Sequence, residues 1–286
     1  MTETVNKFHI YNKTMVDLFS NILKSSETIF KNEIALDPEF IPKKIPFREL
    51  ENDYIATCIK PLFYKRTGKN LIINGPSGIG KTLAAKSVLK ELEDQTDDII
   101  PIYVNCWKKN TTYQIVLEIC KSIDYKFTQN KRTDELISII AERLNKKCSA
   151  FVLDEVDKIQ ELDILYNLAE SIYRKSIMLI TNEKEWLVKL DSRIRSRLVP
   201  EQLEFRPYTL EETKGILKQR VEYAFHPGVI EESCIKKVAE RAFLARDIRL
   251  GLYLLRESAE IAESASSKKI EIEHIDQAMR KIGDFR

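Results

Sequence analysis

The sequence predicts an α/β fold in which a five-stranded parallel sheet is followed by a small, all-helical domain. Short apolar runs alternate with stretches of helical spacing as far as residue 205, a pattern typical of a parallel sheet covered by helices on both faces. Beyond Pro207 no strand signal remains. Helical spacing recurs there over residues 209–224, 231–243, 247–263 and 272–282.

The predicted strands are short and apolar. They are residues 71–73, 99–104, 150–153, 177–180 and 202–205. Pro101 lacks the backbone N–H that a central strand donates, so it favours an edge strand or a bulge.

Three parts are predicted along the chain. An amphipathic helix over residues 12–31 and a proline-punctuated stretch precede a helix over residues 48–65. We therefore expect an N-terminal helical arm over 1–40, an α/β domain over 41–206 and a helical domain over 207–286.

Composition and charge favour a globular protein of the cytoplasm over a membrane-spanning or secreted one. The 286 residues are 43% hydrophobic and 31% charged, which is typical of a globular protein. The net charge is only +2, so any surface that binds nucleic acid must be local. The five cysteines are scattered, which favours reduced thiols. Without a signal peptide or a membrane-length apolar run, a cytoplasmic protein with no membrane partner is predicted.

One glycine-rich loop predicts a phosphate site. Gly75-Pro76-Ser77-Gly78-Ile79-Gly80-Lys81-Thr82 follows the Walker A pattern G-x-x-x-x-G-K-[ST], between an apolar strand and a helix. Backbone N–H groups at such a helix start favour an anion. Lys81 is expected to reach the β- and γ-phosphates of ATP, and the Thr82 hydroxyl to bind Mg²⁺.

Two acids end the strand over residues 150–153, as in a Walker B motif. Adjacent residues on a strand point to opposite sides, so Asp154 and Glu155 can hold different roles. Asp154 is expected in the Mg²⁺ shell, and Glu155 is expected to orient and polarise the attacking water. A solvated strand end is the alternative.

Further polar residues follow the strands. Asn182 ends the strand over 177–180 and could hold the hydrolytic water or the γ-phosphate; a turn-forming asparagine is the alternative. Arg193 and Arg197 are candidates for an arginine finger acting in a neighbouring subunit, against a solvated charge run. Arg249 opens a helix from which it could reach the phosphates, against a surface ion pair with Asp247.

Together these motifs resemble an AAA+ ATPase. Residues 29–33, 36–42 and 45–49, with 224–230 and 247–249, are similar to the signatures of the archaeal origin-recognition and cell-division-control initiator family. That family marks replication origins and helps load the replicative helicase. The resemblance implies an AAA+ core, a helical lid and Mg²⁺-dependent, slow ATP hydrolysis.

The resemblance also assigns residues. Asn182 is implied as sensor one, Arg249 as sensor two, Arg197 as the best candidate finger and Arg193 as the second. Three residues are implied beside the adenine: Ile41, Pro42 and Arg48. Residues 122–132 fall where the family carries a helical insertion that touches DNA. The candidates there are Lys126, Phe127, Lys131 and Arg132, and a solvated loop is the alternative.

Two departures from the family pattern shape the expected function. Arg246 stands where the family usually has glycine, and the sequence stops at Arg286, where the family continues into a winged-helix domain. We therefore expect weak or low-specificity binding of duplex DNA. A replicative helicase or other replication protein and self-association through the finger are the other expected partners. Two alternatives stay open: a nucleotide-gated adaptor for a protein partner, and a mobile-element ATPase that coats DNA.

Overall fold

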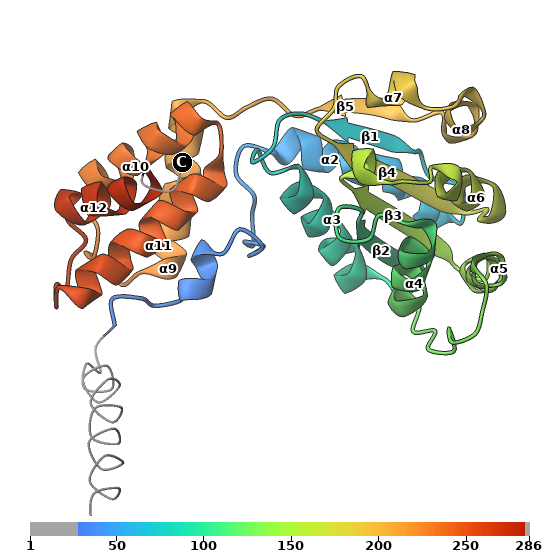
Figure 1. The fold of residues 1–286 in the computed structure, drawn as a ribbon, viewed down its shortest axis with the longest axis horizontal. Coiled ribbons are helices and arrows are strands. Elements are labelled where there is room, and N and C mark those ends of the chain that lie inside the picture. Colours follow the sequence, from blue (N-terminus) through green and yellow to red (C-terminus); the bar gives the residue numbers. More distant parts are fainter. Residues whose placement is uncertain (1–27, 284–286) are drawn as a thin grey trace, which may run out of the picture. The chain divides into compact units, whose positions relative to one another are not determined.

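The predicted five-stranded parallel sheet is confirmed. The computed structural model describes residues 28–283, and its strands lie in the order β2-β3-β4-β1-β5 (Figure 1). Every strand pair is parallel. The strands are β1 (Leu71–Asn74), β2 (Ile99–Asn105), β3 (Cys148–Asp154), β4 (Lys175–Thr181) and β5 (Glu201–Glu204).

Proline marks one edge of this sheet. Strand β2 pairs only with β3, and Pro101 lies opposite Ala150. The edge position predicted from Pro101 is therefore confirmed, because an edge strand needs hydrogen bonds on one side only.

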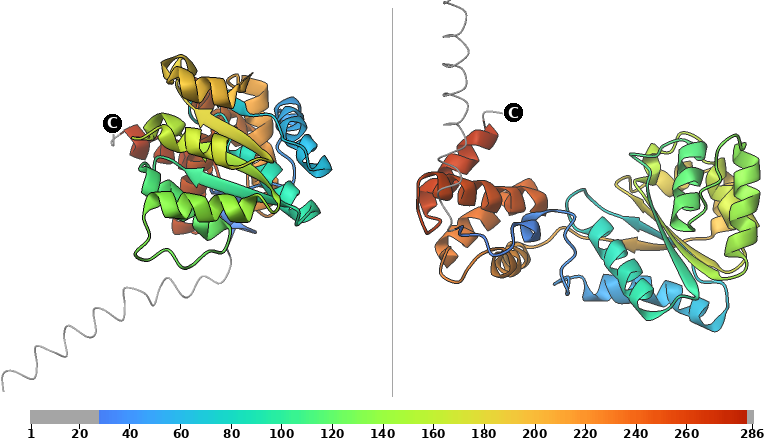
Figure 2. Two further views of the ribbon diagram at one scale, coloured as in Figure 1. Left: turned by 90° about the vertical axis from the view of Figure 1, so that its right-hand side faces the viewer. Right: turned by 90° about the horizontal axis from the view of Figure 1, so that it is seen from below.

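Helices cover both faces of the sheet (Figures 1 and 2). Alternate strand residues face opposite sides, so Val152 packs with one helical layer and Phe151 with the other. The first layer contains α2 (Glu49–Ile59) and α3 (Lys81–Gln95). The second layer contains α4 (Thr112–Ser122), α5 (Thr133–Leu144), α6 (Asp163–Ser171), α7 (Trp186–Lys189) and α8 (Ser192–Leu198). This double burial explains why the strands are continuous apolar runs.

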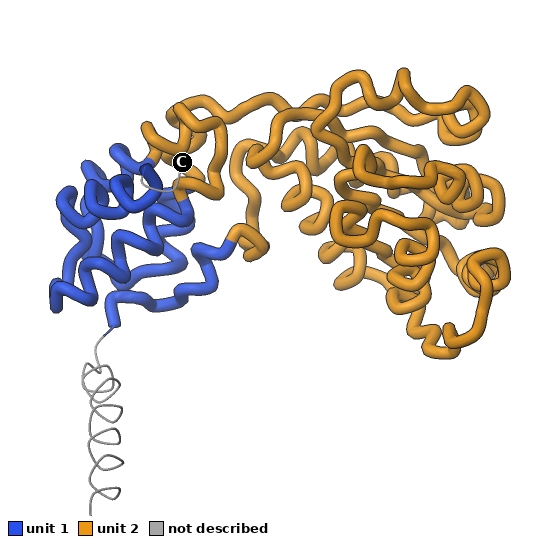
Figure 3. Tube along the Cα trace, viewed as in Figure 1, with its two compact units in different colours: residues 1–37, 217–238, 252–286 blue, residues 38–216, 239–251 orange. Residues whose placement is uncertain are grey.

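The chain after β5 is helical, as predicted. The helices are α9 (Leu210–Ala224), α10 (Glu232–Ala245), α11 (Ile248–Ser264) and α12 (Ile272–Gly283). The chain divides into two compact units (Figure 3): residues 38–216 with 239–251, and residues 1–37 with 217–238 and 252–286. The boundaries at residues 40 and 206 stay predictions; residues 207–216 and 239–251 group with the sheet.

Residues 28–37 belong to the second of these units. The backbone N–H groups of Lys31 and Asn32 donate to the Ala224 carbonyl at 2.8 and 3.0 Å, and the rings of Phe30 and Phe225 lie 5.3 Å apart. Most of the helix predicted over residues 12–31 lies outside the described residues, and residues 28–31 form no helix. Across residues 28–283, no helix has the length and apolar character that crossing a bilayer requires.

Helix α10 ends in a Schellman motif, and Arg246 occupies its left-handed position. The Asp247 N–H donates to the Ala242 carbonyl at 3.1 Å, and the Arg246 N–H donates to the Phe243 carbonyl at 3.0 Å. Arg246 has a φ of 53°. This conformation favours glycine, because a side chain at positive φ crowds the backbone. The position therefore accounts for the glycine that the resemblance leads one to expect.

Replacing Arg246 with glycine is expected to stabilise the protein. Relief of the left-handed conformation should raise the free energy of unfolding by about 0.5–1 kcal/mol. Thermal unfolding should shift upward by about 1–3 °C. Arg246→Ala removes the same side chain and keeps a Cβ, so it should give no such gain. Equal gains in both variants would show that the side chain, not the backbone, carries the cost.

Candidate functional site

The Walker A loop lies between β1 and α3, as its pattern predicts. Gly80 precedes the first residue of α3 with a φ of 91°, and a Cβ there would lie 2.9 Å from the Tyr208 hydroxyl. Only glycine meets both demands without strain. The loop therefore turns sharply enough to aim the first N–H groups of α3 at one point, which suits a phosphate.

Lys81 joins the loop to β4. Its ammonium donates to the carbonyls of Gly75 and Pro76, each at 2.7 Å, and to Oδ1 of Asn182 at 2.8 Å. The side chain is buried, and burial lowers the pKa of Lys81 to about 8. The structure thus brings together the two residues that the sequence placed on the γ-phosphate.

Thr82 joins the same loop to β3. Its hydroxyl donates to Oδ2 of Asp154 at 2.7 Å, and the Tyr103 hydroxyl donates to the same oxygen at 2.9 Å. Asp154 is buried. A hydroxyl beside a carboxylate at the end of a parallel strand fits the oxygen ligands that Mg²⁺ prefers, so these residues suit the predicted ion.

Glu155 follows Asp154 in a left-handed conformation, with a φ of 55°. Glu155 therefore lies just beyond β3, which ends at Asp154. Burial, together with the charges of Asp154 and Asp157, raises the pKa of Glu155. A carboxylate with a raised pKa is a stronger base. Its pKa also lies nearer the operating pH, where general-base catalysis is most effective.

Arg249 contacts the Walker A loop. Its guanidinium donates to the Ser77 hydroxyl at 3.1 Å and pairs with Asp247 at 2.7 Å. The Ile248 N–H donates to the Gly78 carbonyl at 3.3 Å, which fixes the start of α11 against the loop. Arg249 thus pairs with Asp247 and stands beside the loop, and its contact with the phosphates stays a prediction.

Arg48 makes contacts that were not predicted from the sequence. Its side chain is fully buried, and its guanidinium donates to the Ile79 carbonyl at 3.2 Å and to the Arg206 carbonyl at 2.6 Å. The guanidinium also lies 4.1 Å from the ring centroid of Tyr208. Ile41 is half-buried and Pro42 buried. The place of these residues beside the adenine stays a prediction.

Both candidates for the arginine finger lie on α8, and each forms an ion pair. Arg197 pairs with Glu170 of α6, and Arg193 pairs with Asp191 at 3.2 Å. Their side chains remain 50% and 75% exposed, so both are accessible to a neighbouring molecule.

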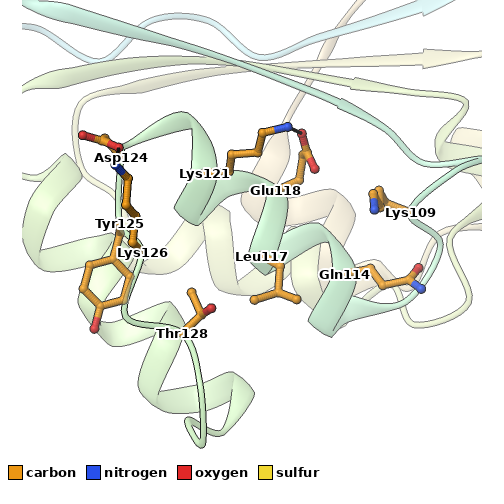
Figure 4. Close-up of a pocket in the computed structure, with 9 residues that line it drawn as sticks. All are labelled: Lys109, Gln114, Leu117, Glu118, Lys121, Asp124, Tyr125, Lys126 and Thr128. Carbon is orange, nitrogen blue, oxygen red and sulfur yellow. Dashed lines mark ion pairs between the residues drawn. The ribbon is translucent and has the colours of Figure 1, made fainter.

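The segment expected to hold a helical insertion is a loop over residues 123–132 that joins α4 to α5. Phe127 is 78% exposed, Lys126 lies 3.5 Å from Asp124, and Arg132 lies 3.1 Å from Asp134. Lys131 is half-buried. Beside the loop lies an open groove of about 420 Å³ (Figure 4). Its lining residues are Lys109, Gln114, Leu117, Glu118, Lys121, Asp124, Tyr125, Lys126 and Thr128.

Two residues that shape the site could not be picked out from the sequence. Tyr103 bonds Asp154, and Asp157 accepts from the Thr181 hydroxyl at 2.9 Å. Tyr103 carried a weak signal, since it is the one hydroxyl-bearing residue in the apolar run over 99–104. Asp157 lies in the short 3-10 helix Val156–Lys158 after β3, where spacing carries no comparable signal.

Two family models match the chain. A model described as an AAA domain matches residues 65–183, and one described as a Cdc6 AAA+ ATPase-type lid domain matches residues 214–280. The first match contains the Walker A and Walker B motifs.

Related proteins cover nearly the whole chain. The ORC1-type DNA replication protein 1 of Archaeoglobus fulgidus is 33% identical, over 93% of this chain and 69% of that protein. Its namesake from Sulfurisphaera tokodaii is 32% identical, over 94% of this chain and 71% of that protein.

Solved structures of proteins with similar names have the same fold as this chain. Aeropyrum pernix ORC1, in complex with DNA, superposes with a TM-score of 0.81 and 30% identity, over 90% of this chain and 71% of that one. The Cdc6p structure from Pyrobaculum aerophilum shares the fold, with a TM-score of 0.80 and 21% identity, over 89% and 72%. The chain belongs to the family of ORC1-type DNA replication proteins, AAA+ ATPases of the origin-recognition and Cdc6 type.

Proposed function

We propose that this chain is an ATP-dependent replication initiator. In this proposal it binds ATP with Mg²⁺ and hydrolyses it slowly, and the bound nucleotide controls contact with duplex DNA and with a replicative helicase or another replication protein. The observation that carries the proposal is the convergence of β1, β3 and β4 on one loop. Lys81 bonds Asn182, and the adjacent Thr82 bonds Asp154.

Each residue has a defined task in hydrolysis. Lys81 and Arg249 offset negative charge on the phosphates, and Asn182 positions the γ-phosphate or the attacking water. Glu155 accepts a hydrogen bond from that water and orients it in line with the leaving group. When bound, Mg²⁺ neutralises charge on the β- and γ-oxygens; Thr82 and Asp154 are the residues that would hold it.

Slow turnover follows from the placement of the fingers. Arg197 is held by Glu170 of its own chain, and Arg193 is held by Asp191. Exposed ion pairs of this kind are weak and readily exchanged. We propose that Arg197, with Arg193 as the second candidate, leaves its partner only when a neighbouring subunit presents a bound nucleotide. A single subunit then lacks the arginine that speeds phosphoryl transfer.

The DNA part of the proposal rests on the loop over residues 123–132 and on the relative whose structure contains DNA. Aeropyrum pernix ORC1 was solved with DNA, and it is 30% identical to this chain. Lys126, Lys131 and Arg132 supply positive charge for phosphates, and the exposed ring of Phe127 can stack or enter a groove. Two further lysines line the adjoining groove: Lys109, before α4, and Lys121, in its last turn and 3.5 Å from Glu118.

Nucleotide binding should draw a proton from solution at alkaline pH. With its pKa lowered to about 8, Lys81 is mostly neutral at pH 9, and a bound phosphate favours its charged form. Calorimetry in buffers of different ionisation enthalpy should therefore detect uptake approaching about one proton per ATP at pH 9, and little at pH 7. Lys81→Arg, which keeps its charge at both pH values, should show no uptake. Equal uptake in both proteins would assign the proton to another group.

Loss of the proposed base should separate binding from hydrolysis. Glu155→Gln keeps a side chain of the same shape and should bind ATP normally, but it should hydrolyse about 10²–10⁴-fold more slowly. Phosphate release and equilibrium binding of a fluorescent ATP analogue measure the two effects. Glu161→Gln, at an exposed position, is the matched control. Full hydrolysis by Glu155→Gln would remove Glu155 from the role of base.

DNA binding should depend on both nucleotide and salt. Anisotropy of a labelled duplex is expected to rise with this protein, to differ between ATP, ADP and no nucleotide, and to fall with salt. Lys126→Ala and Lys131→Ala should each lower the salt slope by about 0.9, if each residue contacts one phosphate. Lys90→Ala, on the exposed face of α3, should leave the slope unchanged. Absence of binding at low salt in every nucleotide state would instead favour a protein partner.

A further inference from the structure

Tyr103 reaches the predicted Mg²⁺ site from the edge strand. Strand β2 pairs with β3 so that Tyr103 lies opposite Val152, and Asn105 lies opposite Asp154. Val152 and Asp154 are two residues apart and share one face of β3, as Tyr103 and Asn105 do on β2. The tyrosine is long enough to cross this diagonal, and its hydroxyl lies 2.9 Å from Oδ2 of Asp154.

Two hydroxyls converge on that single oxygen. Thr82 donates to Oδ2 at 2.7 Å and Tyr103 donates at 2.9 Å, whereas none of residues 28–283 donates a hydrogen bond to Oδ1 of Asp154. Two donors from different directions fix the rotation of a carboxylate. The geometry therefore holds Oδ2 within the protein and leaves Oδ1 available to a cation or to a water in its shell.

The tyrosine itself is held in place. The Lys86 ammonium lies 4.6 Å from the centroid of the Tyr103 ring, and Lys86 also pairs with Glu39. In this position the Tyr103 hydroxyl donates its hydrogen bond to the Asp154 carboxylate.

We propose that Tyr103 is a positioning residue for the Mg²⁺ of the nucleotide site, acting through Asp154. The inference rests on the proposed binding of Mg²⁺ with ATP. Groups that orient metal ligands in this way typically change metal affinity about 10–100-fold when removed. Tyr103 touches neither substrate nor ion, so its loss should change the affinity for Mg²⁺ and leave the affinity for metal-free nucleotide unchanged.

The test is a Mg²⁺ titration of nucleotide binding at equilibrium. An ATP analogue with a fluorophore on its ribose is bound first in EDTA and then at rising Mg²⁺. In Tyr103→Phe the Mg²⁺ concentration for half-maximal effect should rise about tenfold or more, with unchanged binding in EDTA. Tyr54→Phe is the matched control, because the Tyr54 hydroxyl also bonds a carboxylate, Glu201, at 2.6 Å, but at the opposite end of the sheet.

The same substitution made in an Asp154→Asn protein distinguishes a positioning role from a general loss of structure. If Tyr103 acts through Asp154, the Tyr103→Phe change should have no further effect on Mg²⁺ dependence in Asp154→Asn. Equal Mg²⁺ dependence in wild type and Tyr103→Phe overturns the inference alone, as does an additive effect in Asp154→Asn. Mg²⁺-independent binding by the wild type overturns the proposed function and this inference with it. Reduced binding of Tyr103→Phe in EDTA would also contradict a role confined to the metal.

Discussion

The site depends on one pair of adjacent side chains, Lys81 and Thr82, at the first turn of α3. The lysine bonds Asn182 at the end of β4, and the threonine bonds Asp154 at the end of β3. Because parallel strands end at the same edge, these two bonds join the ends of β3 and β4 to the start of α3, which β1 reaches through the Walker A loop. The Lys81 ammonium also bonds the carbonyls of Gly75 and Pro76 in its own loop.

Arg48 supports this loop from outside. Its guanidinium holds the Ile79 carbonyl of the loop and the Arg206 carbonyl that follows β5, and it pairs with Glu51. The rings of Phe205 and Tyr208 lie 4.8 and 4.1 Å from it, so the charge is buried among aromatic faces and acceptors. Removing one partner of such a buried charge is costly, because the buried charge is then left without full compensation. The Walker A loop and the segment leading to α9 are thus linked by one side chain.

Much of this arrangement could be predicted from sequence, because its signals are local. Apolar strands give continuous runs when helices bury both faces, and Pro101 marked the edge. The Walker A and Walker B motifs lie at the ends of strands. Asn182 was expected near them from the end of the next strand, and Arg249 from its place at the start of a helix. Contacts between residues distant in sequence could not be predicted. Nothing in the spacing indicates that Tyr103 crosses from β2 to Asp154, or that Arg48 is buried against Ile79. The positive φ of Arg246 is a local feature, but an arginine at that position gives no sign of it. Residues 122–132 fall where the family carries a helical insertion, and the structure has a loop over residues 123–132, as in the alternative left open.

Hydrogen–deuterium exchange of the full chain, with and without ATP and Mg²⁺, tests the location of the nucleotide site most directly. We expect slower exchange in peptides that cover residues 75–82, the end of β3 at Asp154 and Asn182 just after β4. We expect the same for residues 247–249, since Arg249 contacts Ser77. Protection confined to other segments, or unchanged exchange over residues 75–82 at saturating ATP, would contradict a nucleotide site at this loop.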